Sequence, residues 1–188
     1  AVGYNKVSFA DVPDGSWCFD AVTYLAARGI TKGTGSDTFS PDAYLTRSDF
    51  ITLLMRAYGI EADEAYSDNF TDAGSTYYTG YLAAAKRLGI SDGVGDNKFA
   101  PEQFITRQET FTLMYRTLNL LEKLPKETSD KSLQSFSDSG DIEPFARDAV
   151  DYLVKAGAIN GSDSMLNPKA VTTRAQMAQL IYNLLSRL

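Results

Sequence analysis

A short segment built around a threonine and an arginine occurs three times along this chain of 188 residues. The three copies are Leu45-Thr46-Arg47-Ser48-Asp49, Ile105-Thr106-Arg107-Gln108-Glu109 and Thr172-Thr173-Arg174-Ala175-Gln176. Recurrence at a spacing of about 60 residues indicates a repeated supersecondary unit. Because a unit of that length buries too little surface to be stable alone, we expect three units to pack together around a shared core.

Each copy predicts the start of a helix. The threonine is a good N-cap, and the residue three positions later is able to return a hydrogen bond to it in a capping box. The caps are Thr46, Thr106 and Thr173, and their partners are Asp49, Glu109 and Gln176. Beyond each cap, apolar side chains recur at the spacing of one buried helical face. These side chains are Ile51, Leu54, Met55 and Tyr58, then Phe111, Met114, Tyr115 and Leu118, then Ala178, Ile181, Tyr182 and Leu185.

A first helix is expected earlier in each unit, after a Phe-x-Asp segment that reads as an aromatic anchor and a turn. These segments are Phe9-Ala10-Asp11, Phe70-Thr71-Asp72 and Phe136-Ser137-Asp138. The apolar faces of the first helices are Trp17, Ala21, Val22 and Leu25, then Tyr78, Leu82, Ala85 and Leu88, then Phe145, Ala149, Val150 and Leu153, with Pro144 at the N1 position of the last. Gly29, Gly89 and Gly157 are predicted to end these helices as left-handed C-caps.

A glycine-rich loop joins the two helices of each unit. The loops run from Gly33 to Pro41, from Gly93 to Pro101 and from Gly161 to Pro168. Phe39, Phe99 and Leu166 are predicted to hold these loops against the core. The chain therefore divides into units 1–60, 61–125 and 126–188, and the second helix of the middle unit is expected to run to about Leu124, before Pro125.

The arginine of the repeated segment stands at an unfavourable place. A cation in the first turn of a helix opposes the helix macrodipole, yet Arg47, Arg107 and Arg174 all occupy that turn. Beside free backbone N–H groups, an arginine adds a planar donor for a carboxylate or phosphate, so the segment is a candidate anion site. The alternative is an arginine that pairs with an acid of a neighbouring unit.

The amino-acid composition excludes several classes of function. A net charge of −6 argues against nucleic acid as a partner, and no apolar run approaches the length of a membrane-spanning helix. No targeting segment opens the sequence, so either a leader has been removed or the protein is not exported. Histidine is absent, which removes His-based catalysis and His-based metal sites. Cys18 is alone and is expected to be a small buried hydrophobe.

Taken together, these segments resemble the S-layer homology domain, over nearly the whole chain from Phe9 to Leu188. The resemblance implies an all-α fold in which three helix-loop-helix repeats pack as a pseudo-threefold bundle. It also implies a secreted, non-catalytic module without a cofactor, which anchors proteins to the bacterial cell wall or S-layer. Its expected partner is secondary cell-wall polysaccharide ending in pyruvylated N-acetylmannosamine, bound in the grooves between repeats.

The resemblance also assigns candidate ligand-binding residues. Arginines of the motif would meet the pyruvyl carboxylate, with the neighbouring threonines beside them and the glycine loops forming a wall of each groove. By position these are Arg47, Arg107, Arg174, Thr46, Thr106, Thr173, Gly33, Gly35, Gly93, Gly95, Gly161 and Ser162. Asp11, Asp72 and Asp138 occupy an early acidic position, for which turn capping and sugar binding both remain open.

The three copies differ from one another. The first ends in Ser-Asp and the third in Ala-Gln, and the third loop is one residue shorter. We therefore expect one or two grooves to dominate binding, including the one that contains Arg107, whose copy is nearest to the family pattern.

Other functions compete with anchoring. A self-assembling surface-layer segment would use the repeats for contacts with other S-layer protomers, and its arginines would pair with acids. A glycosidase would need two suitably placed carboxylates, and no pair among the 24 Asp and Glu residues stands out. The acidic segment 137–141 lacks the ligand pattern of an EF-hand, so a solvated loop is the favoured interpretation there. Tyr44 and Phe104 precede two of the Thr-Arg pairs, where packing is favoured over stacking against a sugar.

Overall fold

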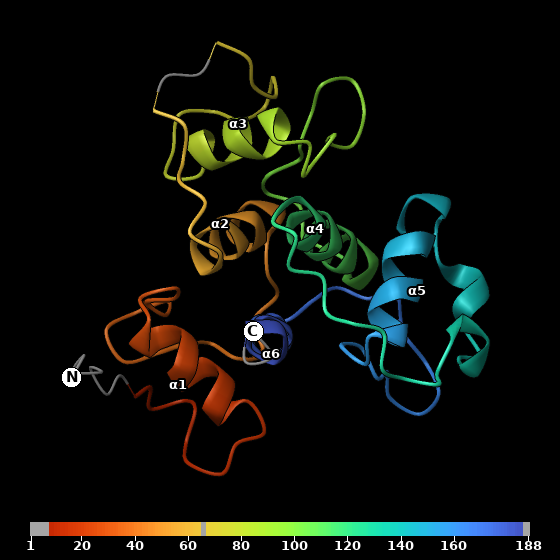
Figure 1. Cartoon of the computed structure of the whole chain (residues 1–188). Coiled ribbons are helices and arrows are strands. Elements are labelled where there is room, and N and C mark those ends of the chain that lie inside the picture. Colours follow the sequence, from red (N-terminus) through yellow and green to blue (C-terminus); the bar gives the residue numbers. More distant parts are fainter. Residues whose placement is uncertain (1–7, 65–66, 186–188) are drawn as a thin grey trace.

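The computed structural model describes residues 8–64 and 67–185, and within these ranges the chain folds into α-helices without a β-strand (Figure 1). The all-α prediction is therefore confirmed for this part of the chain. The helices are α1 (Phe19–Ala27), α2 (Arg47–Ala57), α3 (Thr79–Arg87), α4 (Arg107–Leu120), α5 (Arg147–Lys155) and α6 (Arg174–Leu185). Three short 3-10 helices precede α5, namely η1 (Leu133–Ser135), η2 (Ser139–Asp141) and η3 (Pro144–Ala146).

The predicted capping boxes form at α4 and α6. Thr106 accepts a hydrogen bond from the backbone N–H of Glu109, and the Glu109 carboxylate accepts one from the Thr106 N–H at 2.8 Å. At α6, the Gln176 N–H donates to the Thr173 hydroxyl at 3.3 Å, and the Gln176 amide oxygen accepts from the Thr173 N–H at 3.1 Å. A glutamine thus closes the box as completely as a glutamate does.

At α2 the box is only half formed. The Thr46 hydroxyl accepts from the Asp49 N–H at 3.1 Å, but Asp49 returns no hydrogen bond to the Thr46 backbone. Its carboxylate instead accepts a hydrogen bond from the Tyr77 hydroxyl. The prediction of a reciprocal box at this copy was wrong, because an aspartate side chain is one methylene shorter and is held by a residue of the next repeat.

The glycine C-caps are confirmed. Gly29, Gly89 and Gly157 follow α1, α3 and α5 with φ values of 69°, 69° and 65°. Helix α4, however, ends at Leu120, so its predicted extension to Leu124 was wrong. Glu122 takes a left-handed conformation with φ 55°, and the N–H of Lys123 donates back to the Leu118 carbonyl at 2.8 Å. This is the Schellman arrangement, formed here without glycine.

The beginnings of the first helices also differ from the prediction. Trp17 and Phe145 were expected on the buried helical face, yet they precede α1 and α5 and are 64% and 52% exposed. Pro144 opens η3 rather than the α-helix itself. Tyr77 holds the equivalent place before α3 and is 59% exposed. Each repeat therefore presents one exposed aromatic side chain just ahead of its first helix.

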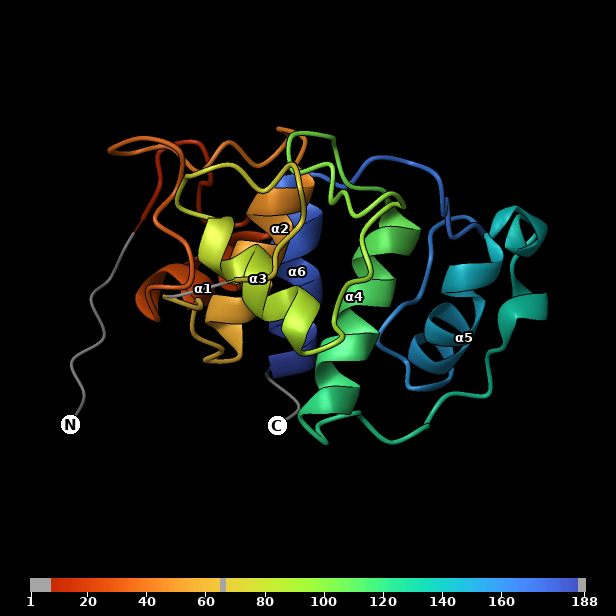
Figure 2. The same ribbon diagram turned by 90° about the horizontal axis from the view of Figure 1, so that it is seen from above.

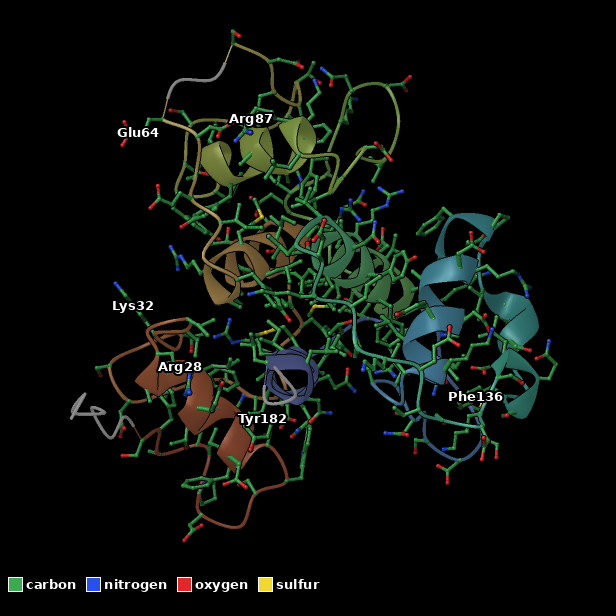
Figure 3. The ribbon with its side chains drawn as sticks, in the orientation of Figure 1. Arg28, Lys32, Glu64, Arg87, Phe136 and Tyr182 are labelled. Atoms are coloured by element: carbon green, nitrogen blue, oxygen red, sulfur yellow. The ribbon has the colours of Figure 1, made fainter. Side chains whose placement is uncertain are left out.

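The first helix of each repeat packs on the second helix of another repeat. Helix α3 contacts α2, α5 contacts α4, and α1 contacts α6 (Figure 1). Tyr182 of α6 points toward α1 (Figure 3), where its ring meets Tyr24 edge-on with centroids 5.1 Å apart. Because these contacts all cross between repeats, the core is shared among the three, as predicted.

Helices α2, α4 and α6 lie at the centre, with their N-terminal ends at the same face (Figure 2). Backbone hydrogen bonds join the residues just ahead of these ends. The Leu45 N–H donates to the Thr172 carbonyl at 3.0 Å, the Ile105 N–H to the Leu45 carbonyl at 2.9 Å, and the Thr172 N–H to the Ile105 carbonyl at 2.9 Å. The three copies of the repeated segment therefore meet in one closed ring of hydrogen bonds.

The predicted core residues are buried. Phe39, Phe99 and Leu166 are fully inaccessible to solvent, and the anchors Phe9, Phe70 and Phe136 are buried beside the loops. Cys18 is also buried, as expected. Among the described helices, none has the length and apolar character that crossing a bilayer requires.

Candidate functional site

The three arginines each reach into the glycine-rich loop of another repeat. Arg47 donates from Nε to the Phe99 carbonyl oxygen at 2.8 Å, Arg107 to that of Leu166 at 2.8 Å, and Arg174 to that of Phe39 at 2.7 Å. The guanidinium groups of Arg47 and Arg174 also lie over the rings of Phe99 and Phe39, with 4.8 Å to each centroid. One edge of every arginine therefore has a structural role, which the sequence did not reveal.

Backbone N–H groups at the starts of the second helices are occupied. The N–H groups of Arg47 and Ser48 donate to the carbonyls of Gln103 and Pro101, at 2.8 and 3.1 Å. Arg107 and Gln108 donate in the same way to Ala170 and Pro168, and Arg174 and Ala175 donate to Ala43 and Pro41. The next N–H in each helix is held by the threonine cap. The expectation of free N–H groups for an anion was therefore wrong, and only the guanidinium groups can serve.

The early aspartates hold the loops in place. The Asp11 carboxylate accepts hydrogen bonds from the backbone N–H groups of Phe39 and Ser40, at 2.8 and 2.7 Å. Asp72 and Asp138 do the same for residues 99–100 and 166–167. Burial favours a raised pKa for Asp11, but these two hydrogen bonds and the nearby Arg174 outweigh it, so the pKa lies below its usual value. Asp138 is buried, so the interpretation of its segment as a solvated loop was wrong there.

The first glycine of each loop is required by close packing. A Cβ on Gly93 would lie 2.2 Å from the Lys98 carbonyl oxygen and 2.8 Å from the Phe70 ring. Gly33 and Gly161 are equally confined, against Phe9 and Phe136. The second positions differ among the loops. Gly95 accepts from the Lys98 N–H at 2.9 Å, the Gly35 N–H donates weakly to Thr38 at 3.4 Å, and the Ser162 N–H donates to Met165 at 2.9 Å.

One groove of about 680 Å³ lies beside Arg107. Its walls are the third glycine loop with Gly161 and Ser162, the polar side of α6, and the exposed ring of Trp17 from the first repeat. Five amide side chains line it, namely Asn160, Asn167, Gln176, Gln179 and Asn183. None of the described residues that line it is Asp or Glu. We call this the Arg107 groove.

An equivalent groove of about 450 Å³ lies beside Arg47. The second glycine loop with Gly93 and Val94 forms one wall, α4 forms another, and Phe145 stands where Trp17 stands in the Arg107 groove. This Arg47 groove contains acids. Glu109 pairs with Arg47, with Nη1 and Oε1 2.5 Å apart, and Arg116 pairs with Asp92 at 2.9 Å.

The surroundings of Arg174 are different again. Tyr77 stands at the place of Trp17 and Phe145, and its hydroxyl donates to Asp49 in the first turn of α2. Burial lowers the pKa of Arg174, while Asp49 and Asp11 oppose that shift. The Tyr77 ring thus bridges from the start of α3 to the start of α2.

Burial and neighbouring carboxylates have opposite effects on the pKa of the motif arginines. Burial lowers the pKa of Arg47 and Arg107. Glu109 opposes this shift at Arg47, whereas only the more distant Asp138 does so at Arg107. Among residues 8–64 and 67–185, no carboxylate lies within ion-pair distance of Arg107, and its two terminal amino groups make no hydrogen bond. A poorly solvated cation in this condition favours an external anion.

The other candidate residues, the threonines and the exposed aromatics, have different roles. Thr46, Thr106 and Thr173 are occupied as helix caps, as the capping interpretation predicted. Tyr44 and Phe104 form a ring pair with centroids 5.5 Å apart, but both are more than half exposed. Sequence reasoning missed the groove aromatics and the amides of the Arg107 groove. The aromatics had a usable signal, because each stands two residues before its helix.

Comparison with known proteins gives the same family for all three repeats. A family model described as the S-layer homology domain matches residues 8–51, 69–111 and 135–178. An amylopullulanase of Thermoanaerobacterium thermosulfurigenes is 33% identical over 100% of this chain and 10% of its own length. The exoglucanase XynX of Acetivibrio thermocellus is 32% identical over 97% of this chain and 17% of its own length.

S-layer proteins match over the same stretch. The S-layer protein sap of Bacillus anthracis is 28% identical over 93% of this chain and 21% of its own length. The chain therefore spans a tenth to about a fifth of the length of these curated relatives. Relatives with different names share this one stretch.

Proposed function

The chain belongs to the S-layer homology domain family, and from that premise we propose that it anchors the protein carrying it to the cell wall by binding an anionic polysaccharide. Membership of this family, together with its S-layer protein relatives, makes it a cell-surface module. The ligand proposed is secondary cell-wall polysaccharide whose terminal N-acetylmannosamine carries a pyruvyl ketal. The carboxylate of that ketal is the anion, and Arg107 is its principal partner.

We also propose that the repeats, over residues 1–60, 61–125 and 126–188, form a pseudo-threefold bundle. The closed ring through Leu45, Ile105 and Thr172 supports this arrangement. So does the order in which each arginine donates to the loop of the next repeat and the last donates to the first. Each groove then draws its walls from all three repeats.

The observation that carries the proposal is the unpaired guanidinium of Arg107 in a groove without acids. A pyruvyl carboxylate would supply the missing counter-ion and two acceptor oxygens for the planar donor. Asn160 and Gln179 beside it can both donate to and accept from sugar hydroxyls and the acetamido group, whereas Gln176 is engaged in the capping box of α6. Trp17 offers an apolar face to a sugar ring, and a groove of this kind suits a small polar ligand.

Catalysis is not proposed for the Arg107 groove. Hydrolysis of a glycosidic bond needs an acid and a base or nucleophile on either side of the bond. The described lining of this groove contains no carboxylate that would fill either role. The glucanase and amylopullulanase relatives share this stretch with S-layer proteins, which supports an anchoring role that is separate from their own reactions.

The test is calorimetric titration of the chain with synthetic N-acetylmannosamine that carries a 4,6-linked pyruvyl ketal, beside the same sugar without the ketal. We expect binding only with the ketal, and loss of that binding in Arg107→Ala. Arg47→Ala and Arg174→Ala are the matched variants, checked for folding by circular dichroism. Equal binding of both sugars would move recognition away from the arginine, and equal loss in all three variants would contradict a dominant Arg107 groove.

A further inference from the structure

We infer that a single residue position decides which of the three grooves accepts an anion, and that this chain has one anion-binding groove, beside Arg107. The position is the last residue of the repeated segment, where Asp49, Glu109 and Gln176 stand. This inference rests on the proposed function and assigns its carboxylate recognition to one site.

The packing between repeats sets each arginine opposite the last segment residue of the following repeat. Arg47 lies beside Glu109, which it contacts directly. Equivalent backbone hydrogen bonds at the start of α4 give Arg107 the same register, and it lines one groove together with Gln176. At α6, the backbone N–H groups of Arg174 and Ala175 donate to Ala43 and Pro41 in the same register, and the carboxylate of Asp49 acts on the charge of Arg174.

Arg47 already has its counter-ion. Glu109 Oε1 accepts from the Arg47 guanidinium, while Oε2 accepts from the N–H and the hydroxyl of Thr106. Both carboxylate oxygens are therefore held, and a ligand carboxylate would have to displace Glu109 or lie against its negative charge. Like charges brought together in this way disfavour binding strongly.

Arg174 makes no ion pair among the described residues, but Asp49, in the first turn of α2, and Asp11 both act on its charge. The hydroxyl of Tyr77 holds Asp49 and so fixes the Tyr77 ring across the first turn of α2. Phe145 has no hydroxyl with which to make such a bridge in the Arg47 groove.

Gln176 leaves Arg107 without a carboxylate from the facing segment, and the acid that acts on its charge is Asp138, whose oxygens are held by the third loop. It closes the capping box of α6 as Glu109 does for α4, but it brings no charge. Glutamine in place of an acid at position 176 thus preserves the start of α6. It also removes the negative charge that would otherwise face Arg107. How closely the copy that contains Arg107 matches the family motif is therefore less important for binding than the charge of the facing residue, Gln176.

The experiment exchanges these two residues in the full chain. Gln176→Glu places a carboxylate beside Arg107, and Glu109→Gln removes the one beside Arg47. Gln176→Met is the neutral control, since it alters the contact without adding a charge. The probe is the pyruvylated N-acetylmannosamine of the previous section, and the unketalated sugar is the blank. Circular dichroism establishes that each variant is folded.

Two measurements separate the grooves. Calorimetry gives the number of sites per chain. Trp17 is the only tryptophan in the sequence and lines the Arg107 groove, so its fluorescence reports occupancy of that groove alone. For the wild-type chain we expect one site and a fluorescence change with the same dissociation constant.

The variants have opposite expected outcomes. Gln176→Glu should weaken binding by about tenfold or more, because the new carboxylate competes with the ligand for Arg107. Gln176→Met should keep binding within a few-fold. Glu109→Gln should raise the stoichiometry from one to two, and the second site should leave the Trp17 signal unchanged.

The possible failures are distinguishable. If the wild-type chain does not bind the ketal, the proposed function fails and this inference fails with it. If the wild-type chain binds but Gln176→Glu binds equally well, or if it binds two or three ligands, only the inference is overturned. Equal losses in Gln176→Glu and Gln176→Met would assign Gln176 a contact role and would also overturn it.

Discussion

Arg174 donates from Nε to the carbonyl oxygen of Phe39 across 2.7 Å, although 135 residues separate them. The bond joins the start of the last helix to the first loop of the chain. Two equivalent bonds link Arg47 to Phe99 and Arg107 to Leu166. Any one of the three therefore affects how two repeats are held together.

Replacing Arg174 by alanine should destabilise the fold. The Phe39 carbonyl would lose a charged donor, which is worth about 1.5–3 kcal/mol in the free energy of unfolding. Arg174→Lys should not restore the loss, because a lysine lacks an Nε donor within a planar group. Urea unfolding measures both changes. The control is Lys169→Ala, which removes only an exposed ion pair with Glu143. It should change the free energy of unfolding by less than about 0.5 kcal/mol. Equal losses for Arg174→Ala and Lys169→Ala would contradict the structural role of Arg174.

Alanine at Gly93 should be far more damaging than at Gly89, a glycine of similar backbone conformation. At Gly89, where φ is +69° and a Cβ would meet nothing, the cost should be about 1–2 kcal/mol from the left-handed backbone alone. At Gly93 the same cost adds to the overlap with Lys98 and Phe70. Gly140→Ala meets no atom and needs no positive φ, so it should be nearly neutral. The melting temperatures should decrease from Gly140→Ala to Gly89→Ala to Gly93→Ala. A Gly93→Ala variant as stable as Gly89→Ala would count against the packing argument.

The Asp11 carboxylate should make stability depend on pH. Its folded pKa lies below the usual 3.8, so its contribution is fully present above that value and is lost as pH falls through the folded pKa. Asp11→Asn should therefore lower the melting temperature at pH 7, and the difference from wild type should shrink below about pH 4. Melting curves from pH 7 to pH 3 measure this, and a difference that stays constant over the range would argue against an ionised Asp11.

Trp17 should contribute to ligand affinity and little to stability. It is 64% exposed and lines the Arg107 groove, so Trp17→Ala removes an aromatic surface for the sugar while leaving the core intact. Loss of an anchoring aromatic costs more than about 1 kcal/mol, which is roughly fivefold or more in the dissociation constant. Calorimetry with the pyruvylated sugar tests this. Phe145→Ala, which changes the equivalent place in the Arg47 groove, is the control and should bind with unchanged affinity.

Local patterns in the sequence predicted the helices well, because caps and apolar spacing depend on neighbours within a few residues. Thr106 with Glu109 and the buried Phe99 are examples. The end of α4 was missed because Glu122 adopts a left-handed conformation that glycine or asparagine usually takes. Asp49 was missed because its side chain is held by Tyr77, which is 28 residues away.

The candidate site was less predictable than the fold. The motif arginines were identified, but their pairing depends on which repeat lies beside which, and spacing along the chain does not encode that. The contact between Arg47 and Glu109 spans 62 residues. The three copies end in Asp49, Glu109 and Gln176, and only the packing of the repeats shows which arginine lies near each of these residues.

The packing of α1 against α6 also has a mechanical consequence. These helices belong to the first and last repeats, so a force that pulls α1 and α6 apart acts directly on the interface between them. In that geometry the bond from Arg174 to Phe39 would rupture early, while those from Arg47 and Arg107 join repeats that are consecutive in sequence. The Arg107 groove takes Trp17 from across that interface, so opening the interface would remove one wall of the groove.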